Sequence, residues 1–327
     1  MNINPSIEKA YKVLDGKELS RDEAVELTRS VGADDLLDLI SLANKVRKKF
    51  APAFTACSII NARSGRCSQD CKFCAQSGRH LTQIETYPLV SPETALEAAK
   101  KVYDQGVRTF GYVTSGRGWT APDDEFQTIL DAVDLILESL PGIKVCASLG
   151  ILSEECVALL AKHGVWRYNM NIQTNPARYS ELIATTHTIE EKIETIRLMK
   201  KYGITNCTGG IIGLGETWED RIDMAFALKE LDVDGINLNV LLPIKGSPLE
   251  YLPIMRPADV AKTAALFRLV NPTKSVKFCA GRETTMKDFQ GLLMLSGLDS
   301  VITGGYLTTR GREVSDDDAF IDRLRDF

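Results

Sequence analysis

The sequence lacks several features that mark membrane, secreted or nucleic-acid-binding proteins. No apolar run approaches the roughly 20 residues that a membrane-spanning helix needs. The N-terminal stretch MNINPSIEKAYKVLDG has neither the basic start nor the apolar core of a secretion signal. No block of Lys and Arg stands out, and the net charge is −5 with a pI near 5.5. We therefore expect a cytoplasmic protein whose partners include neither a membrane nor a nucleic acid.

The chain also lacks a Gly/Ser/Pro-rich linker that would divide it into separate domains. Its 327 residues, 44% hydrophobic and 25% charged, are enough for one large barrel with a substantial core. Residues 1–48 have the pattern of helices, and we expect them to form an N-terminal extension. We assign residues 49–310 to the barrel. Residues 311–327 are predicted to be a charged, exposed tail of the same domain that ends in a short helix.

Short β-like segments alternate with amphipathic helical stretches between these two ends. Several helical stretches, such as 91–106 and 188–203, end in Gly, a common residue at a helix C-terminus. Eight strands alternating with helices over about 250 residues predict an α/β protein with a (β/α)8 TIM-type barrel rather than an open doubly wound sheet. The predicted strands cover residues 54–61, 109–115, 144–150, 167–173, 205–210, 236–242, 275–281 and 300–304.

Eight cysteines are present, and in a reducing compartment we do not expect disulfides. Three of them, Cys67, Cys71 and Cys74, follow the first predicted strand in CSQDCKFC. In a barrel this loop lies on the C-terminal face, where active sites are found. Three thiolates can hold three irons of a 4Fe–4S cluster and leave the fourth iron open to a small molecule. The alternatives are a zinc site, for which His80 is the only nearby fourth ligand, and buried structural thiols.

Several segments carry a resemblance to a known family. The CxxxCxxC pattern is similar to that of the radical S-adenosylmethionine (SAM) enzymes, and its flanks in NARSGRCSQDCKFCAQS resemble those of the biotin synthase family. YNMNIQT with the following TTHTIEEK, then CTGGIIGLGETWEDR, NVLLPIKGSPL and KFCAGRE, occur in that family's order and spacing. The resemblance covers roughly residues 50–310.

This resemblance implies a radical SAM sulfurtransferase that converts dethiobiotin to biotin. In this family SAM binds the open iron, one electron cleaves it to methionine and a 5′-deoxyadenosyl radical, and a second iron–sulfur cluster supplies the sulfur. The resemblance also implies a flavodoxin or ferredoxin as the electron donor, and a homodimer.

The same resemblance assigns the site residues. The three loop cysteines would hold the SAM-binding cluster, with Phe73 against the adenine. Asn171 and Asn239 would contact the substrate, since each offers the donor and the acceptor that a cyclic urea requires. The glycines of residues 209–217 would let the backbone approach the cofactor closely. The candidates for SAM contacts, besides Phe73, are Ser115, Asn171, Gln173, Lys192, Glu216 and Leu242.

The SAM-binding segments depart from the family's common pattern at three positions. Met170 replaces a histidine, and Gln173 replaces the ribose-binding aspartate. Gln173 can still donate and accept at a ribose hydroxyl, but without charge. His187 stands where arginine is common, while Lys192 keeps a cation nearby.

The second cluster site departs further. The common site uses three cysteines and an arginine, but here Gly111 occupies the second-strand cysteine position and Lys277 the arginine position. Cys146 and Cys207 alone would leave the site incomplete.

A different set of cysteines provides a replacement. Alternate strands of a (β/α)8 barrel contribute one layer of four side chains. We therefore predict that four thiols converge in the lumen and hold an auxiliary cluster, either 2Fe–2S or, as we favour, a four-iron type. The alternative is that these four cysteines are unrelated and simply buried in the core. We expect Cys156, in a predicted helix, to be such a core thiol. The four cysteines, one on each odd-numbered predicted strand, are Cys57, Cys146, Cys207 and Cys279.

Three other functions stay open from the sequence. Another radical SAM barrel enzyme, of the maturase or mutase type, would cleave SAM without transferring sulfur to dethiobiotin. An electron-transfer or iron–sulfur scaffold protein would not need a Gly-rich SAM motif. A zinc-stabilised barrel would be colourless.

Overall fold

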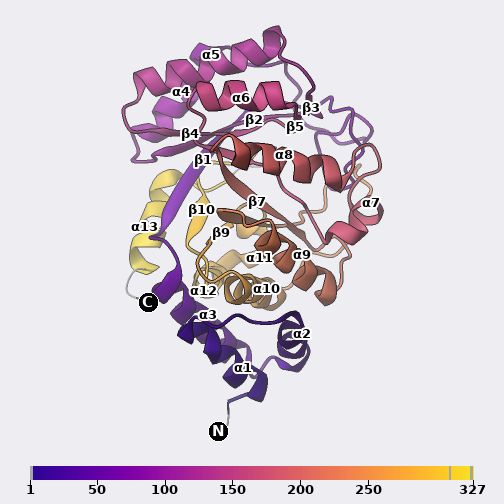
Figure 1. Cartoon of the computed structure of the whole chain (residues 1–327), viewed down its shortest axis with the longest axis vertical. Coiled ribbons are helices and arrows are strands. Elements are labelled where there is room, and N and C mark those ends of the chain that lie inside the picture. Colours follow the sequence, from indigo (N-terminus) through magenta and orange to yellow (C-terminus); the bar gives the residue numbers. More distant parts are fainter. Residues whose placement is uncertain (1–2, 309–310, 325–326) are drawn as a thin grey trace.

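Eight parallel strands close into a barrel in the computed structural model, which describes residues 3–308, 311–324 and 327 (Figure 1). The predicted (β/α)8 architecture is confirmed, and each predicted segment overlaps one barrel strand. In the order in which they pair around the barrel, the strands are β1 (Thr55–Arg63), β2 (Thr109–Thr114), β4 (Lys144–Ser148), β6 (Arg167–Asn169), β7 (Thr205–Ile212), β8 (Gly235–Val240), β9 (Ser275–Phe278) and β10 (Ser300–Ile302), which pairs with β1.

Helices cover the outside of the barrel (Figure 1). Two of them begin at a capping box, in which Thr188 or Thr217 exchanges hydrogen bonds with an acidic residue three positions on. Among the described residues, no helix is both long and apolar enough to cross a bilayer. The longer covering helices are α4 (Pro92–Tyr103), α5 (Asp124–Ser139), α6 (Glu154–Lys162), α8 (Ile189–Lys201), α9 (Trp218–Glu230) and α10 (Pro257–Val270). The short ones are η2 (Pro176–Arg178), α7 (Tyr179–Leu182), α11 (Arg282–Met286), η3 (Lys287–Phe289) and α12 (Gln290–Leu295).

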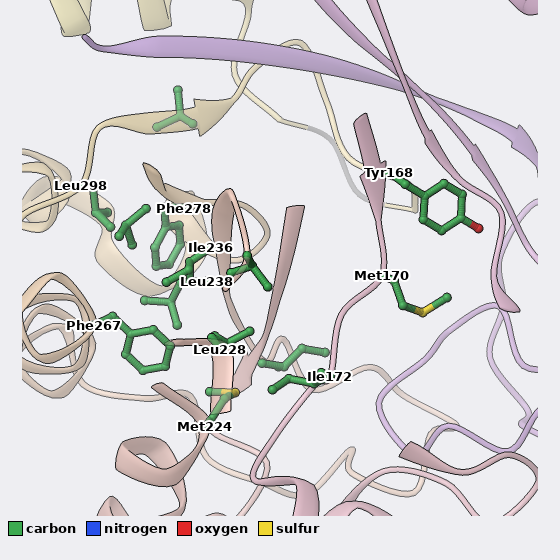
Figure 2. Close-up of a cluster of buried hydrophobic side chains, with 14 of the residues drawn as sticks. Tyr168, Met170, Ile172, Met224, Leu228, Ile236, Leu238, Phe267, Phe278 and Leu298 are labelled. Carbon is green, nitrogen blue, oxygen red and sulfur yellow. The ribbon is translucent and has the colours of Figure 1, made fainter. Parts of the chain in front are cut away.

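Strand side chains alternate between the helices and the lumen, as the two-residue period of a strand requires. On β8, Ile236 and Leu238 are fully buried and pack with Phe267 of α10 in the core between strands and helices (Figure 2). Asn237 and Asn239 alternate with them and line the lumen. β8 therefore contributes polar side chains to the lumen and apolar side chains to the surrounding core.

A second, two-stranded sheet was not anticipated from the sequence. β3 (Gly118–Trp119) pairs with β5 (Ile151–Leu152) just beyond the ends of β2 and β4. The backbones approach so closely that a Cβ on Gly118 would lie 1.8 Å from the Ile151 carbonyl oxygen. Two-residue strands carry too little pattern to be recognised in a sequence.

The N-terminal helices pack against one side of the barrel (Figure 1). They are α1 (Pro5–Ala10), η1 (Tyr11–Asp15), α2 (Arg21–Ser30) and α3 (Leu36–Phe50), and α2 contacts α9 while α3 contacts α10 and α12. Lys262 of α10 donates through Nζ to the carbonyl oxygens of Thr28 and Val31, both at 2.7 Å. These contacts fix the extension to the helical layer.

The C-terminal segment differs from the predicted exposed tail. Its helix α13 runs from Val314 to Leu324 and buries Val314, Asp317 and Ile321. Asp317 accepts from Arg282 Nη2 through both carboxylate oxygens at 2.8 Å. Because the apolar and acidic residues share one helical face, the segment docks on the barrel instead of remaining in solvent.

Candidate active site

A cavity of about 360 Å³ fills the barrel lumen. Side chains from both predicted sites line it, including the loop residues Phe73 and Cys74, Asn171 just beyond β6, and Asn239 on β8. The four cysteines that we predicted on the odd-numbered strands, called the odd-strand cysteines below, all line this one cavity. In the structure three of them lie on β1, β4 and β7, and Cys279 follows the last residue of β9. They are Cys57, Cys146, Cys207 and Cys279, and all are free thiols.

Lys277 places a buried cation among these four thiols. Its Nζ lies 3.8 Å from Cys207 Sγ. Burial lowers the pKa of Lys277, but the neighbouring thiols, Cys207 foremost, raise the pKa above its ordinary value. Burial raises the pKa of Cys146 to about 12, while Lys277 opposes that shift. The lumen thus combines thiols with a positive charge that favours their ionised form.

The CxxxCxxC loop leaves β1 and folds back on itself. The Cys67 N–H donates to the Gln76 carbonyl at 3.0 Å, and the Gly78 N–H donates to the Cys67 carbonyl at 2.7 Å. Cys74 also donates through its backbone N–H to the carbonyl of Cys71, at 2.9 Å. These bonds hold the three cysteines in one tight loop beside the cavity.

Side chains within the loop anchor it to the segment before α8. Asp70 accepts hydrogen bonds from the backbone N–H and hydroxyl groups of Thr185 and Thr186 at 2.6–3.2 Å. Burial opposes the ionised form of Asp70, but these donors hold the pKa of its carboxyl well below the usual range. The carboxylate therefore fixes the position of Cys71, its neighbour in the chain.

His187 provides a second anchor. Its Nδ1 lies 3.0 Å from Gln69 Oε1 and its Nε2 2.7 Å from the Tyr179 hydroxyl. Since an amide oxygen only accepts, Nδ1 carries the proton and Nε2 accepts from Tyr179. Burial, reinforced by the charge of Lys192, lowers the pKa of His187 to about 4. The histidine is thus a neutral link between Tyr179 and the cluster loop.

The zinc alternative finds no support in this geometry. His80 Nε2 lies 2.9 Å from the carbonyl oxygen of Cys71 rather than facing the thiols. Across the described part of the chain, no three His, Cys, Asp or Glu side chains gather around a point that one ion could occupy. Ligands of a single zinc must all lie about 2.0–2.3 Å from it, whereas thiols that bind different irons of one cluster stand further apart.

Four predicted SAM-binding residues line the cavity: Phe73, Asn171, Gln173 and Leu242. Asn171 Oδ1 and Gln173 Oε1 are buried and have no hydrogen-bond partner in the protein. A buried amide oxygen without a partner is costly, so these two acceptors fit a ligand that donates to them, such as the hydroxyl or amine groups of SAM. The donor set of the cavity is therefore compatible with SAM beside the loop.

Lys192 lies just behind this wall. Its Nζ is buried and donates to the Asn171 carbonyl at 3.0 Å. Burial raises the pKa of Cys71 and of Cys74, and the charge of Lys192 opposes both shifts. Asn239, on β8, donates to the Gly210 carbonyl at 3.1 Å and accepts from the Ala280 N–H at 3.0 Å. Its amide is thus held in a fixed orientation at the cavity wall.

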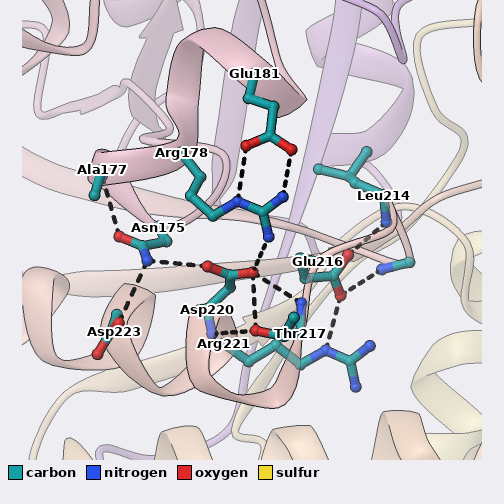
Figure 3. Close-up of polar contacts among 11 residues, drawn as sticks. Asn175, Ala177, Arg178, Glu181, Leu214, Glu216, Thr217, Asp220, Arg221 and Asp223 are labelled. Carbon is teal, nitrogen blue, oxygen red and sulfur yellow. Dashed lines mark hydrogen bonds and ion pairs between the residues drawn. The ribbon is translucent and has the colours of Figure 1, made fainter.

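Glu216 and Ser115 are not among the residues that line this cavity. Glu216 accepts from the N–H groups of Gly213 and Leu214 and from Arg221 Nε at 2.6–2.8 Å, so it shapes its own loop (Figure 3). Ser115 lines a separate cavity of about 460 Å³ behind the cluster loop. Their contact with SAM stays a prediction.

We predicted that the glycines of residues 209–217 let the backbone approach the cofactor. In the structure, two of them are required by contacts within the protein. A Cβ on Gly209 would lie 1.9 Å from the Asn237 carbonyl oxygen, and one on Gly210 2.5 Å from the Gln173 carbonyl oxygen. The two glycines therefore admit neighbouring backbone, and they let the chain after β6 run close to β7. Met170, which replaces the family's histidine, is buried in the core outside the lumen (Figure 2).

Sequence reasoning missed several polar residues of the cavity wall, among them Ser148, Asn169 and Asn237. Asn169 and Asn237 each precede a predicted substrate residue by two positions, and on β8 those two positions share one strand face. That spacing was the available signal.

Two family profiles and several known proteins match this chain. The profile of the radical SAM superfamily matches residues 62–228, and that of the biotin and thiamin synthesis associated domain matches residues 237–325. The biotin synthase of Chlorobium luteolum is 52% identical over 327 residues, covering 99% of this chain and 98% of that protein. The biotin synthase of Chlorobaculum tepidum is 51% identical over 329 residues, again covering 99% and 98%.

Solved structures share the fold at low identity. Methylornithine synthase superposes with a TM-score of 0.80 at 18% identity, covering 97% of this chain and 95% of that one. The FeFe-hydrogenase maturase HydG from Carboxydothermus hydrogenoformans also gives 0.80, at 16% identity, covering 98% and 78%.

The barrel, its three-cysteine loop and the profile match define a radical SAM enzyme. A 4Fe–4S cluster and SAM are the cofactors of that class. The chain belongs, within this class, to the biotin synthase family, since the identity extends over nearly its whole length.

Proposed function

We propose that this chain is a radical SAM sulfurtransferase that inserts sulfur into dethiobiotin to form biotin, using a second iron–sulfur cluster as the sulfur donor. One observation carries the proposal: the four odd-strand thiols, the cluster loop and the polar strand ends all face a single lumen cavity. Sulfur transfer needs this arrangement, because the substrate carbon must lie between the site that activates it and the site that supplies sulfur.

The residues at the top of the cavity fit the first cofactor pair. Cys67, Cys71 and Cys74 would hold a 4Fe–4S cluster, and thiolates are the ligands that such clusters use. Phe73 offers an apolar face for the adenine, and the unpaired oxygens of Asn171 and Gln173 accept from SAM. When bound, the cluster and SAM supply a 5′-deoxyadenosyl radical, and the auxiliary cluster supplies the sulfur.

The second donor set fits an auxiliary cluster of the four-iron type. Cys57, Cys146, Cys207 and Cys279 come from four different strands and surround the buried Lys277. A four-iron cluster held by four thiolates keeps a net negative charge after the irons are counted, and the buried Lys277 ammonium offsets part of it. The barrel wall also keeps water away from the reacting carbon.

The substrate lies between these two sites in this proposal. Asn171 and Asn239 face the cavity from neighbouring parts of its wall, and their amides match the donors and acceptors of the ureido ring of dethiobiotin. We further propose that a flavodoxin or ferredoxin supplies the electron, that the enzyme is a homodimer, and that it works in the cytoplasm.

The test is anaerobic reconstitution with iron and sulfide, followed by reduction in the presence of SAM and dethiobiotin. We expect 5′-deoxyadenosine together with biotin or its thiol intermediate. Formation of 5′-deoxyadenosine alone would contradict sulfur insertion while leaving the radical SAM assignment in place. A maturase or mutase acting on another molecule would give that second result.

A further inference from the structure

A chain of hydrogen bonds starts at one thiol of the lumen, on β7, and continues through residues on three other strands. Cys207 Sγ on β7 donates to Asn237 Oδ1 on β8 at 2.8 Å. Asn237 Nδ2 donates to Asn169 Oδ1 on β6 at 2.7 Å, and Asn169 Nδ2 donates to Ser148 Oγ on β4 at 3.3 Å. All four residues line the cavity. We call Asn237, Asn169 and Ser148 the amide chain.

The amide chain and Lys277 both contact the sulfur of Cys207. Asn237 is only 5% exposed, and Lys277 approaches the same sulfur to 3.8 Å through Nζ. Asn237 and Lys277 are paired in register on β8 and β9. Two polar groups on adjacent strands therefore fix the position of the Cys207 sulfur in the lumen.

The direction of the hydrogen bond between Cys207 and Asn237 depends on whether the sulfur carries a proton or binds a metal. The Cys207 thiol has a proton to donate, so it faces the amide oxygen. A cysteine bound to a metal has lost that proton, and its sulfur can only accept. The oxygen of Asn237 would then face a negative sulfur, which is unfavourable. A half-turn of the amide replaces this contact with a hydrogen bond from Nδ2 to the sulfur.

The rest of the chain can follow that turn without losing a bond. After the turn, Asn237 Oδ1 faces Asn169, whose own half-turn presents Nδ2 to it. Asn169 Oδ1 then faces Ser148, and a hydroxyl can donate as well as accept. The amide chain is thus satisfied in both directions.

We propose that Asn237, supported by Asn169, is a positioning residue that donates a hydrogen bond to the Cys207 sulfur once the auxiliary cluster is bound, and thereby raises the reduction potential of that cluster. The inference rests on the proposed function, since it requires the four lumen thiols to hold a cluster. A donor to a ligating sulfur stabilises the more negative, reduced state. Asn237 and Asn169 then serve the sulfur site, whereas Asn171 and Asn239 serve the substrate.

The experiment is a redox titration of reconstituted enzyme, following both clusters by electron paramagnetic resonance. The variants are Asn237→Leu, which removes the donor, and Asn237→Asp, which replaces it with an acceptor of negative charge. We expect the auxiliary potential to fall in the order wild type, Asn237→Leu, Asn237→Asp. The cluster at the CxxxCxxC loop is the internal control and keeps its potential in every sample.

Three outcomes decide the matter. The expected order supports the inference, because a packing role would not rank an apolar and a charged replacement by their electrostatics. Equal auxiliary potentials in wild type and Asn237→Leu overturn it and leave the proposed function intact. A wild type that binds only the loop cluster overturns both the lumen cluster and this inference. If Asn237→Asp does not load, Asn169→Leu replaces it, and a drop smaller than that of Asn237→Leu is expected.

Discussion

Ile59 occupies the space beside Gly111 in the lumen wall. The two residues are paired in register on β1 and β2, and both line the cavity. A Cβ added to Gly111 would lie 2.9 Å from Ile59 Cγ2. Ile59 is β-branched and therefore stiff at that atom, so it cannot move aside cheaply. The position where the common family pattern has a cysteine is thus closed to any side chain in this barrel.

Restoring that cysteine should therefore cost stability. We expect Gly111→Cys to lower the free energy of unfolding by about 1–3 kcal/mol, the usual cost of overpacking a lumen or core. The cost should fall when Ile59→Ala removes the clashing methyl group, in a double-mutant cycle followed by urea denaturation. An equal cost of Gly111→Cys with and without the Ile59→Ala substitution would contradict the steric explanation.

The odd-strand cysteines are expected to bind iron that the loop cysteines do not. Cys57→Ala and Cys279→Ala should each lower the iron and sulfide content of reconstituted enzyme, while the loop cluster remains. Cys156→Ala is the matched control, because Cys156 is also a buried thiol but lies on α6 and does not line the cavity. Wild-type iron and sulfide in both lumen variants would show that the four thiols do not act together.

The barrel could be predicted because the strand and helix patterns each appear within a short stretch of sequence. The two-residue alternation of β8 and the Gly-terminated amphipathic helices are visible without any knowledge of contacts. The sequence placed one cysteine on each odd-numbered predicted strand, and barrel geometry predicted that their side chains meet in the lumen. All four do line one cavity.

The parts that could not be predicted depend on contacts between distant segments. The role of Asp317 requires Arg282, 35 positions away, and the hydrogen bond from Cys207 requires Asn237, 30 positions away. The closed space beside Gly111 depends on Ile59 of another strand. Such pairs carry no periodic signal, so a single sequence cannot reveal them.

His187 should make the enzyme less stable in mild acid. Its pKa is about 4 in the folded state and 6.5 in the reference state, so the unfolded chain binds more protons between these values. The contribution is complete above pH 6.5 and is lost as the pH falls toward 4. We expect the wild type to lose about 2 kcal/mol more than His187→Gln between pH 7.5 and pH 5.

Glutamine is the appropriate replacement because it can donate to Gln69 and accept from Tyr179 but does not titrate. Anaerobic urea denaturation at the two pH values measures the difference. Identical pH dependence in the two proteins would mean that folding does not shift the pKa of His187.

The last prediction concerns the docking of the C-terminal helix. Arg282 and Asp317 are both fully buried, and the carboxylate is the main partner of the guanidinium. Asp317→Asn removes the nearer, fully buried counter-charge of Arg282 and leaves only Glu283, at 3.3 Å. Breaking a buried pair in this way typically costs about 3–5 kcal/mol. We expect urea denaturation to show a loss of that size.

Asp318→Asn provides the control, since Asp318 is the exposed neighbour on the same helix and a surface substitution usually changes stability by about 0.5 kcal/mol or less. Arg282 lies three residues after Cys279 in KFCAGRE, so freeing the helix also loosens the segment that carries one lumen thiol. Asp317→Asn should therefore lower auxiliary iron content as well as stability, whereas a drop in stability with full iron content would separate the two roles.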